Sequence, residues 1–170
     1  MKLRSHKLGF SLIELLVTIS IITIMTGISI PSFRNYQYKT GLDYNSRLIK
    51  NEIQFARSYS LSPPTAYSGS DMFGIKIDPN TKRIIKMRKN ESDLTGAGIE
   101  IESPIIIAEN YSITQPTSET IFYFKIGYNG DLYKVDNRLP SSNVTIKLAE
   151  NRTGDEKTII VDRLGMIKID

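Results

Sequence analysis

One strongly apolar stretch, residues 9–33, limits what this 170-residue chain can fold into. It reads GFSLIELLVTISIITIMTGISIPSF, and Glu14 is its only charged residue. The part from Leu15 to Phe33 is about 28 Å long as a helix, which matches the hydrocarbon thickness of a bilayer. An acidic side chain at the centre of a membrane helix costs roughly 2.5–3.5 kcal/mol, so such a residue usually has a partner and a function. The stretch predicts a membrane-spanning helix in which Glu14 needs a partner.

Three basic residues, Lys2, Arg4 and Lys7, precede this stretch without an acidic residue among them. Basic residues keep their side of a membrane helix in the cytoplasm, so residues 34–170 are expected outside the cytoplasm. The whole chain has 22 basic and 18 acidic side chains, a net charge of +4. Because the N-terminal segment supplies most of this excess, the overall charge gives little support for nucleic-acid binding. The chain has no cysteine, which excludes disulfides and thiolate metal sites.

Two conventional interpretations of this N-terminus stay open. A secretory signal would be cut after its apolar region, and Gly27-Ile28-Ser29 is a small-x-small triplet suited to such a cut. Against this interpretation, the apolar region would be long for a signal and would contain Glu14. An uncleaved signal anchor would instead remain in the membrane.

The sequence GFSLIELLV resembles the N-terminal motif of type IV prepilins. In that motif a short basic leader ends in a glycine, here Gly9, and the mature chain begins with Phe10 and has a glutamate, here Glu14, as its fifth residue. The resemblance implies that a prepilin peptidase cleaves between Gly9 and Phe10 and methylates the new amine. In a filament, the amine of one subunit would then meet the Glu14 carboxylate of its neighbour. Opposite charges attract strongly at low dielectric constant, which makes Glu14 an assembly residue.

After Pro31, where the family's long helix commonly has a proline, the pattern becomes apolar on one side only. Residues 34–62 repeat apolar or small residues at spacings of three, four or seven, which predicts an amphipathic helix. Ser-Pro-Pro at 62–64 ends this helix, because proline lacks an amide donor and disfavours helix in the residue before it. Gly27 and Pro31 are the expected kink or melting point. The predicted buried stripe consists of Tyr38, Leu42, Ile49, Ile53, Ala56 and Ser60.

Residues 63–170 contain short β-rich runs between turn residues, which predicts seven to nine mostly antiparallel strands. Three hairpins are expected: MFGIKI and RIIKMR around DPNTK, TIFYFKIGY and DLYKV around Asn129-Gly130, and NVTIKLA and KTIIVD around ENRTGDE. MIKID is a last strand, IEIESPIIIAENYSIT contributes one or two more, and RKNESDLTGAG is predicted as a loop. The fold class is α+β, with a long N-terminal helix packed on an antiparallel β-sheet domain.

This order of elements resembles the pilin arrangement, and most closely the GspH/FimT-like minor pilins and pseudopilins. The patterns that carry the resemblance are NEIQFARSYSL, FGIKID, GYNGDL and TIIVDRLGMIKI. It implies a leader over 1–9, a transmembrane and assembly helix over 10–33, an amphipathic half over 34–62, and a β domain over 63–170. The expected location is a single pass in the cytoplasmic membrane, followed by an extracellular or periplasmic filament of pilin subunits.

Catalytic chemistry is not expected. His6 is the only histidine and lies in the leader, so the mature chain lacks the residues for Ser-His or Cys-His catalysis and for ordinary zinc sites. Asp93, Glu100 and Glu102 do not follow a calcium-ligand spacing. Gly96-Ala97-Gly98 lacks the strand and helix context of a nucleotide-binding loop. The sequence therefore predicts no enzyme activity, no cofactor and no metal.

A basic cluster in one predicted hairpin and its following loop suggests a rival function, because some filament-tip pilins of this type take up DNA. A solvated strand face is the simpler interpretation of the cluster, and DNA binding would show a salt-dependent affinity. A third hypothesis is a secreted β-domain protein with a conventional signal. The cluster consists of Lys82, Arg83, Lys86, Arg88 and Lys89, with Tyr67 and Phe73 nearby.

Overall fold

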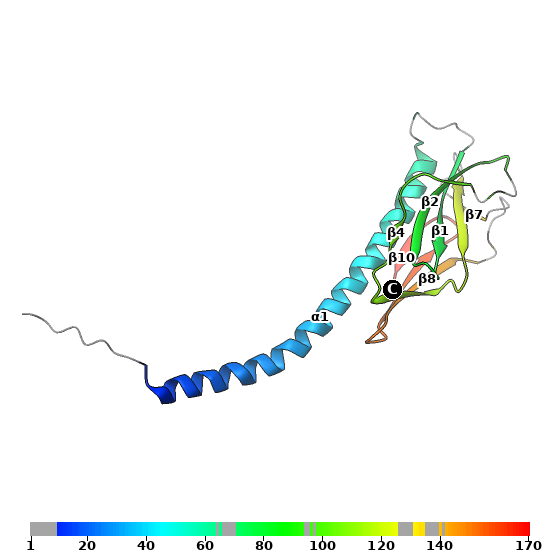
Figure 1. Cartoon of the computed structure of the whole chain (residues 1–170). Coiled ribbons are helices and arrows are strands. Elements are labelled where there is room, and N and C mark those ends of the chain that lie inside the picture. Colours follow the sequence, from blue (N-terminus) through cyan, green and yellow to red (C-terminus); the bar gives the residue numbers. More distant parts are fainter. Residues whose placement is uncertain are drawn as a thin grey trace, which may run out of the picture. The chain divides into compact units, whose positions relative to one another are not determined.

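A computed structural model of the chain describes residues 10–63, 65, 71–93, 96, 98–125, 131–134, 140 and 142–170. The chain divides into two compact units, Met1–Gln37 and Tyr38–Asp170. One α-helix, α1 (Leu12–Leu61), is followed by β-strands (Figure 1). This order confirms the predicted α+β class, a long N-terminal helix packed on antiparallel β-structure.

The end of α1 agrees with the position of Ser-Pro-Pro. The helix ends at Leu61, and the amide of Ser62 still donates to the carbonyl of Ser58 at 2.9 Å. At the other end, α1 runs through Gly27 and Pro31 without a break in its helical assignment. The helix does not melt at Pro31 in the single chain, and a bend at this residue stays a prediction.

The described residues form ten strands in two antiparallel sheets, where we expected seven to nine strands in one sheet. The first sheet has the order β3-β2-β1-β6-β7, with β4 also paired to β2, and the second has the order β10-β9-β8-β5. The strands are β1 Asp71–Asp78, β2 Arg83–Asn90, β3 Ile99–Glu100, β4 Ile105–Ile106, β5 Tyr111–Gln115, β6 Thr120–Lys125, β7 Leu132–Lys134, β8 Val144–Glu150, β9 Glu156–Val161 and β10 Ile167–Ile169.

Two strand boundaries differ from the prediction. The run IEIESPIIIAENYSIT forms three strands, β3, β4 and β5, because the two short strands both pair with β2 and only β5 joins the second sheet. The loop predicted at RKNESDLTGAG starts later in the structure than in the prediction, since residues 88–90 continue β2 in register with β1. Pairing with neighbouring strands, β1 and β2, thus determines where both of these segments become strand.

The hairpin between β1 and β2 forms as predicted, with Ile77 opposite Ile84 and Asp78 opposite Arg83. Asp78 closes its turn: its carboxylate accepts the Thr81 hydroxyl at 2.6 Å and the amide of Asn80 at 3.0 Å. The bond from the Thr81 hydroxyl lowers the pKa of the Asp78 carboxyl.

The strands of the two other predicted hairpins, β6 with β7 and β8 with β9, are also antiparallel, and the predicted last strand, β10, pairs with β9 in the same way. The Asn129-Gly130 turn lies outside the described residues.

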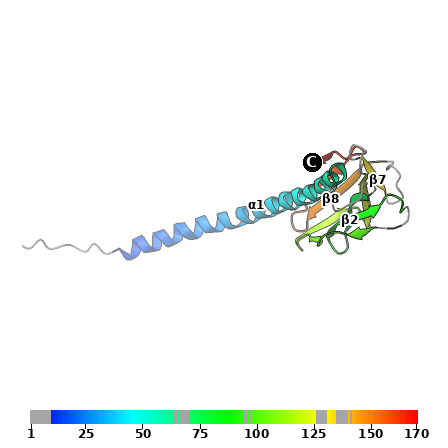
Figure 2. The same cartoon turned by 90° about the horizontal axis from the view of Figure 1, so that it is seen from above.

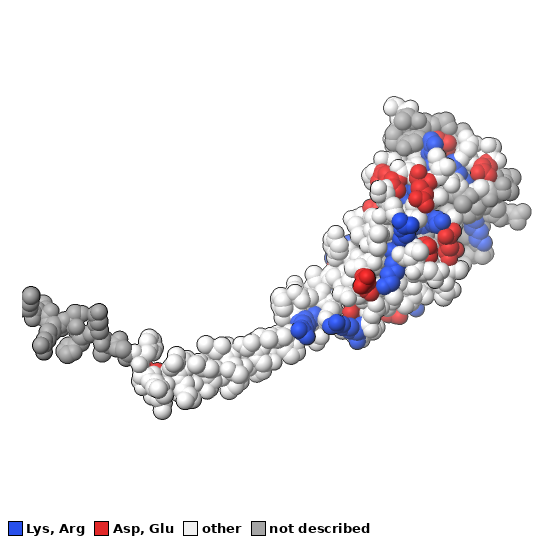
Figure 3. All heavy atoms as spheres, viewed as in Figure 1, with Lys and Arg blue, Asp and Glu red and all other residues white. Residues whose placement is uncertain are grey.

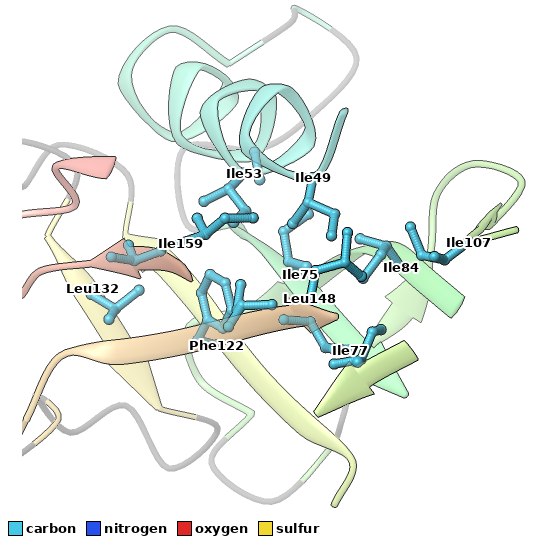
Figure 4. Packing of buried hydrophobic residues seen from close by; sticks show 14 of the residues in the cluster. Ile49, Ile53, Ile75, Ile77, Ile84, Ile107, Phe122, Leu132, Leu148 and Ile159 are labelled. Carbon is cyan, nitrogen blue, oxygen red and sulfur yellow. The ribbon is translucent and has the colours of Figure 1, made fainter. Parts of the chain in front are cut away.

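The main core lies where α1 and the two sheets meet (Figure 4). From the helix, Ile49 and Ile53 are fully buried, and the predicted stripe continues with Leu42, Ala56 and Ser60. Viewed from above, the C-terminal half of α1 runs along the β-structure that it covers (Figure 2). The buried sheet residues of this core are Ile75, Ile77, Ile84, Ile107, Tyr111, Ile113, Phe122, Phe124, Leu132, Ile146, Leu148, Ile159 and Val161.

The other face of the first sheet carries a smaller apolar cluster, formed by Met72, Ile85, Met87 and Tyr123. Gly74 makes room for it, because a Cβ at this position would lie 2.6 Å from the Tyr123 ring. Burial raises the pKa of the Tyr123 hydroxyl. The first sheet is therefore apolar on both faces, although only one face meets the helix.

Where α1 enters the folded unit, a glycine brings the helix close to β5. The Tyr111 hydroxyl donates to the carbonyl of Tyr38 at 3.3 Å, and its oxygen would lie 1.9 Å from a Cβ at position 41. Arg152 reaches the same point, donating to the Tyr38 hydroxyl at 2.6 Å. Gly41 thus permits the contact that fixes this end of the helix segment.

We expect Gly41→Ala to lower the free energy of unfolding by about 1–3 kcal/mol, because the new methyl displaces the Tyr111 side chain. At an ordinary helix position the same change stabilises by about 1 kcal/mol. Gly27→Ala is the matched control, since a Cβ there meets nothing within 4 Å. Thermal unfolding of the full chain in detergent measures both. Adding Tyr111→Phe to Gly41→Ala removes the closest atom and should recover part of the loss; no recovery would contradict the proposed clash.

Candidate functional site

The first turn of α1 gives Glu14 a partner within its own chain. The Glu14 carboxylate accepts the amide of Ser11 at 3.0 Å, and the Ser11 hydroxyl accepts the amide of Ile13 at 3.3 Å. These two bonds form a capping box in which Ser11 caps the amide of Ile13 instead of that of Glu14, and they satisfy amides that the helix itself leaves unpaired. Its sequence signal, Ser-x-x-Glu directly before an apolar run, is present at residues 11–14 but was not used in our sequence interpretation.

Five hydroxyl groups within the apolar half of α1 are also satisfied locally. Each donates to a backbone carbonyl three or four residues earlier, at 2.7–2.8 Å, so none needs water or a partner helix. A polar group without a partner would oppose entry into hydrocarbon by several kcal/mol. These residues are Thr18, Ser20, Thr23, Thr26 and Ser29.

The apolar side chains of the same segment are exposed in the single chain. Phe10 is 88% exposed and Ile28 is 73% exposed, and in Figure 3 this part of α1 shows almost no charged atoms. The helix is long and apolar enough to cross a membrane, and none of its most apolar window is buried in the protein. A core helix of a soluble domain would bury this surface, whereas here it is free to contact lipid or other chains.

Residues 4–30 match the family model for the prokaryotic N-terminal methylation motif. The motif supports a type IV pilin-like protein. Comparisons with curated proteins and with solved structures give no match to the chain. Because the model covers only the N-terminal part of the chain, it supports a pilin-like subunit without separating minor pilins from pseudopilins.

The predicted processing and assembly residues lie at the start of this segment. Phe10 directly precedes the capping box, and Glu14 lies in the first turn of α1. Gly9 is outside the described residues. The positive end of the helix dipole also favours a carboxylate in this first turn.

The five residues of the predicted basic cluster do not share one open face. Lys89 is only 3% exposed, donates to the carbonyl of Asp93 at 2.8 Å and lies over the Tyr123 ring. Arg88 pairs with Asp71 at 3.4 Å on the side of β2 that faces α1. Alternation along β2 separates these side chains, because successive residues point to opposite faces of a strand.

The remaining members of the cluster are in different surroundings. Lys82, at the end of the turn, donates to the carbonyl of Glu109 at 3.0 Å, and Arg83 is exposed. Tyr67 lies outside the described residues, and Phe73 is fully buried. Because most of these cations bind groups of this chain, they do not form a ready surface for phosphates.

Lys86 joins three elements instead of facing solvent. Its Nζ lies 2.9 Å from a carboxylate oxygen of Glu52 on α1, contacts the Glu102 carboxylate after β3, and lies 4.5 Å from the centre of the Phe55 ring. Burial alone would lower the pKa of the Lys86 ammonium, but the Glu102 and Glu52 carboxylates outweigh it, and the net effect raises that pKa. Lys86 thus ties α1 to the edge of the first sheet.

The acidic residues considered for calcium are separated. The Asp93 carboxylate accepts the amide of Gly96 at 2.7 Å, Glu102 pairs with Lys86, and Glu100 belongs to β3. Within the described part of the chain, no three acidic or histidine side chains come together as a metal site.

We expect Lys86→Met to lower the free energy of unfolding by about 1–3 kcal/mol at neutral pH, because Glu52 is then left half-buried without its cation. Arg83→Met, which removes an exposed cation from the same strand, is the control and should have little effect. The folded pKa of Lys86 is raised, so its contribution is complete below its ordinary value of 10.5 and is lost as pH rises through the higher folded value. Denaturant unfolding between pH 7 and 12 should show the two variants converging at high pH. A constant difference would contradict the ionic contribution.

Proposed function

We propose that this chain is a structural filament subunit, a minor pilin or pseudopilin of a type IV pilus or type II secretion filament. The observation that carries the proposal is the methylation motif at residues 4–30, continued by an exposed apolar helix. Within the pilin-like proteins we place it with the GspH/FimT-like members, on the sequence patterns at the end of the helix and in the last strands. A single pass in the cytoplasmic membrane would precede its entry into the filament.

Cleavage after Gly9 would supply a cationic partner for the Glu14 carboxylate in the apolar environment. It creates an amine on Phe10, one helical turn from the carboxylate. The capping box bonds Glu14 to the amide of Ser11, which holds the carboxylate at the start of the helix. In a filament, the Glu14 carboxylate would also meet the Phe10 amine of a neighbouring subunit, and this pairing would set the stagger between helices. The proposed role is structural, with no catalytic step assigned to the folded unit.

The mature N-terminus provides the first test. We expect the chain purified from membranes of a host with a prepilin peptidase to begin at N-methylated Phe10. N-terminal mass spectrometry measures this directly, and Gly9→Val, which blocks the cleavage site with a larger side chain, should leave the leader attached. A start near Ile30 would instead establish a conventional secretory signal and reject the pilin proposal.

Three substitutions separate the charge of Glu14 from its capping bond. Glu14→Ala removes both, Glu14→Gln removes only the charge because an amide oxygen still accepts the Ser11 amide, and Ser11→Ala removes the other half of the capping box. We expect all three to insert in the membrane, and both Glu14 variants to enter filaments about tenfold less or worse. Immunoblotting of sheared filaments against membranes measures the fraction incorporated. Normal incorporation of Glu14→Gln would show that the capping bond, and not charge pairing, is what assembly requires.

A further inference from the structure

The two sides of the buried stripe of α1 face different strands. Glu52 and Phe55 lie on the side of β2, where both contact Lys86. Asp43, Arg47 and Lys50 recur at helical spacing on the other side, towards β9 and β10. Each side of α1 in the folded unit therefore borders the edge of one sheet.

A groove of about 610 Å³ lies between α1 and the edge of the second sheet. Three cations, Arg47, Lys50 and Lys157, line it with one carboxylate, Asp43, which pairs with Arg47 at 2.9 Å. Among the described residues, Lys50 and Lys157 have no ion-pair partner. The groove is therefore basic and polar, and its other lining residues are Asn51, Gln54 and Ile169.

The strand beside this groove, β10, is an edge strand of its sheet. In the order β10-β9-β8-β5, β10 has β9 on one side only. Asp170 exchanges both backbone bonds with Thr158, at 2.8 and 3.0 Å. Because backbone groups alternate in direction along an antiparallel strand, the amides and carbonyls of Ile167 and Ile169 point away from β9. They present an open edge for another strand.

The opposite edge has the complementary charge. Glu100 and Glu102 both belong to the edge of the first sheet, and Glu52 lies on α1 next to it. Glu52 and Glu102 share the ammonium of Lys86, and Glu100, opposite Met87, is exposed, so this edge carries more carboxylates than cations. The amide of Ile101 donates to the carbonyl of Lys86 at 3.1 Å, which turns the backbone groups of Glu100 outward by the same alternation. Ile99, 56% exposed, adds apolar surface to this acidic edge.

We propose that the acidic edge at Ile99–Glu102 of one copy docks against β10 and the basic groove of a second copy. The β3 strand extends the second sheet of its neighbour, and Glu100 lies near Lys50 and Lys157. Since the two edges flank the same helix on opposite sides, each copy offers one of each, and the contact repeats from copy to copy. A contact between different surfaces builds rows instead of closed dimers. The proposal rests on the filament function above and assigns the side-to-side contact of its folded units.

Cross-linking tests the contact, because the chain has no cysteine of its own. Glu100→Cys and Lys157→Cys are made in separate full-length chains, which are co-expressed and treated in isolated membranes with a short bis-maleimide. We expect a cross-linked dimer from the mixture and little from either variant alone. A chain that carries both cysteines should give a ladder of multimers.

Ser118→Cys mixed with Lys157→Cys is the matched control, since Ser118 is exposed in the turn before β6. Dimers from the control at the same yield would overturn the proposal, because they would show random collision. Dimers from a single variant alone would also overturn it, because they would show a symmetric contact. No dimer from the mixture would also overturn it, as expected if another kind of subunit occupies the groove.

Charge exchange tests the same contact with unchanged cysteine positions. With cysteines at Ser92 and Lys168, near the two edges, Glu100→Lys or Lys157→Glu alone should reduce the dimer about two- to fivefold, and both together should restore it. No restoration would contradict the charge pairing. Mass spectrometry of the N-terminus in the same membranes reports processing at Phe10 independently. Processing without cross-links rejects only the docking, whereas an unprocessed chain or a start near Ile30 rejects the filament function itself.

Discussion

The burial of one stripe of α1 between two sheets is the constraint on which the folded unit depends. Ile49 and Ile53 are fully buried against residues of both sheets, and each such side chain contributes roughly 1.5–3 kcal/mol by leaving water. Without this stripe, the sheet residues that pack against it would lose their cover. The helix is thus part of the core of the β-structure, and the same helix continues towards the N-terminus as the exposed apolar segment.

Around this apolar contact, polar groups are satisfied at short range. Asn45 and Ser46, buried on α1, donate to carbonyls of their own helix at 2.8 Å, so the stripe accepts them without a partner in the sheets. The Lys86 ammonium pairs with two carboxylates, Glu52 on α1 and Glu102 in the segment after β3. A buried cation needs such partners, because leaving it unpaired costs far more than the pair contributes.

The polar groups of the apolar N-terminal segment are also satisfied at short range. Five of its hydroxyls donate to the helix backbone, and its one carboxylate accepts the amide of Ser11. These bonds are local, and they depend only on the spacing of residues along a helix. The motif of this segment can therefore be recognised from the sequence alone, whatever surrounds the segment.

The sequence by itself determined the features that local rules control. The apolar run, its Gly-Phe-x-x-x-Glu motif, the stripe from Leu42 to Ser60 and the stop at Ser-Pro-Pro all depend on spacing within a few turns of helix. The described hairpins likewise depend on adjacent strands and short turns. The match to the methylation motif confirms the first of these features, over residues 4–30.

The tertiary structure alone decided how strands far apart in sequence pair and which cations stay on the surface. Residues 88–90 became strand because β1 pairs with them, and two short strands formed because β2 had an open edge. Lys86 and Lys89 were predicted on one exposed face, but alternation sends them to opposite faces, where α1 covers one and Tyr123 the other. A pattern of charges in sequence does not contain this result, because it depends on what packs above and below the strand.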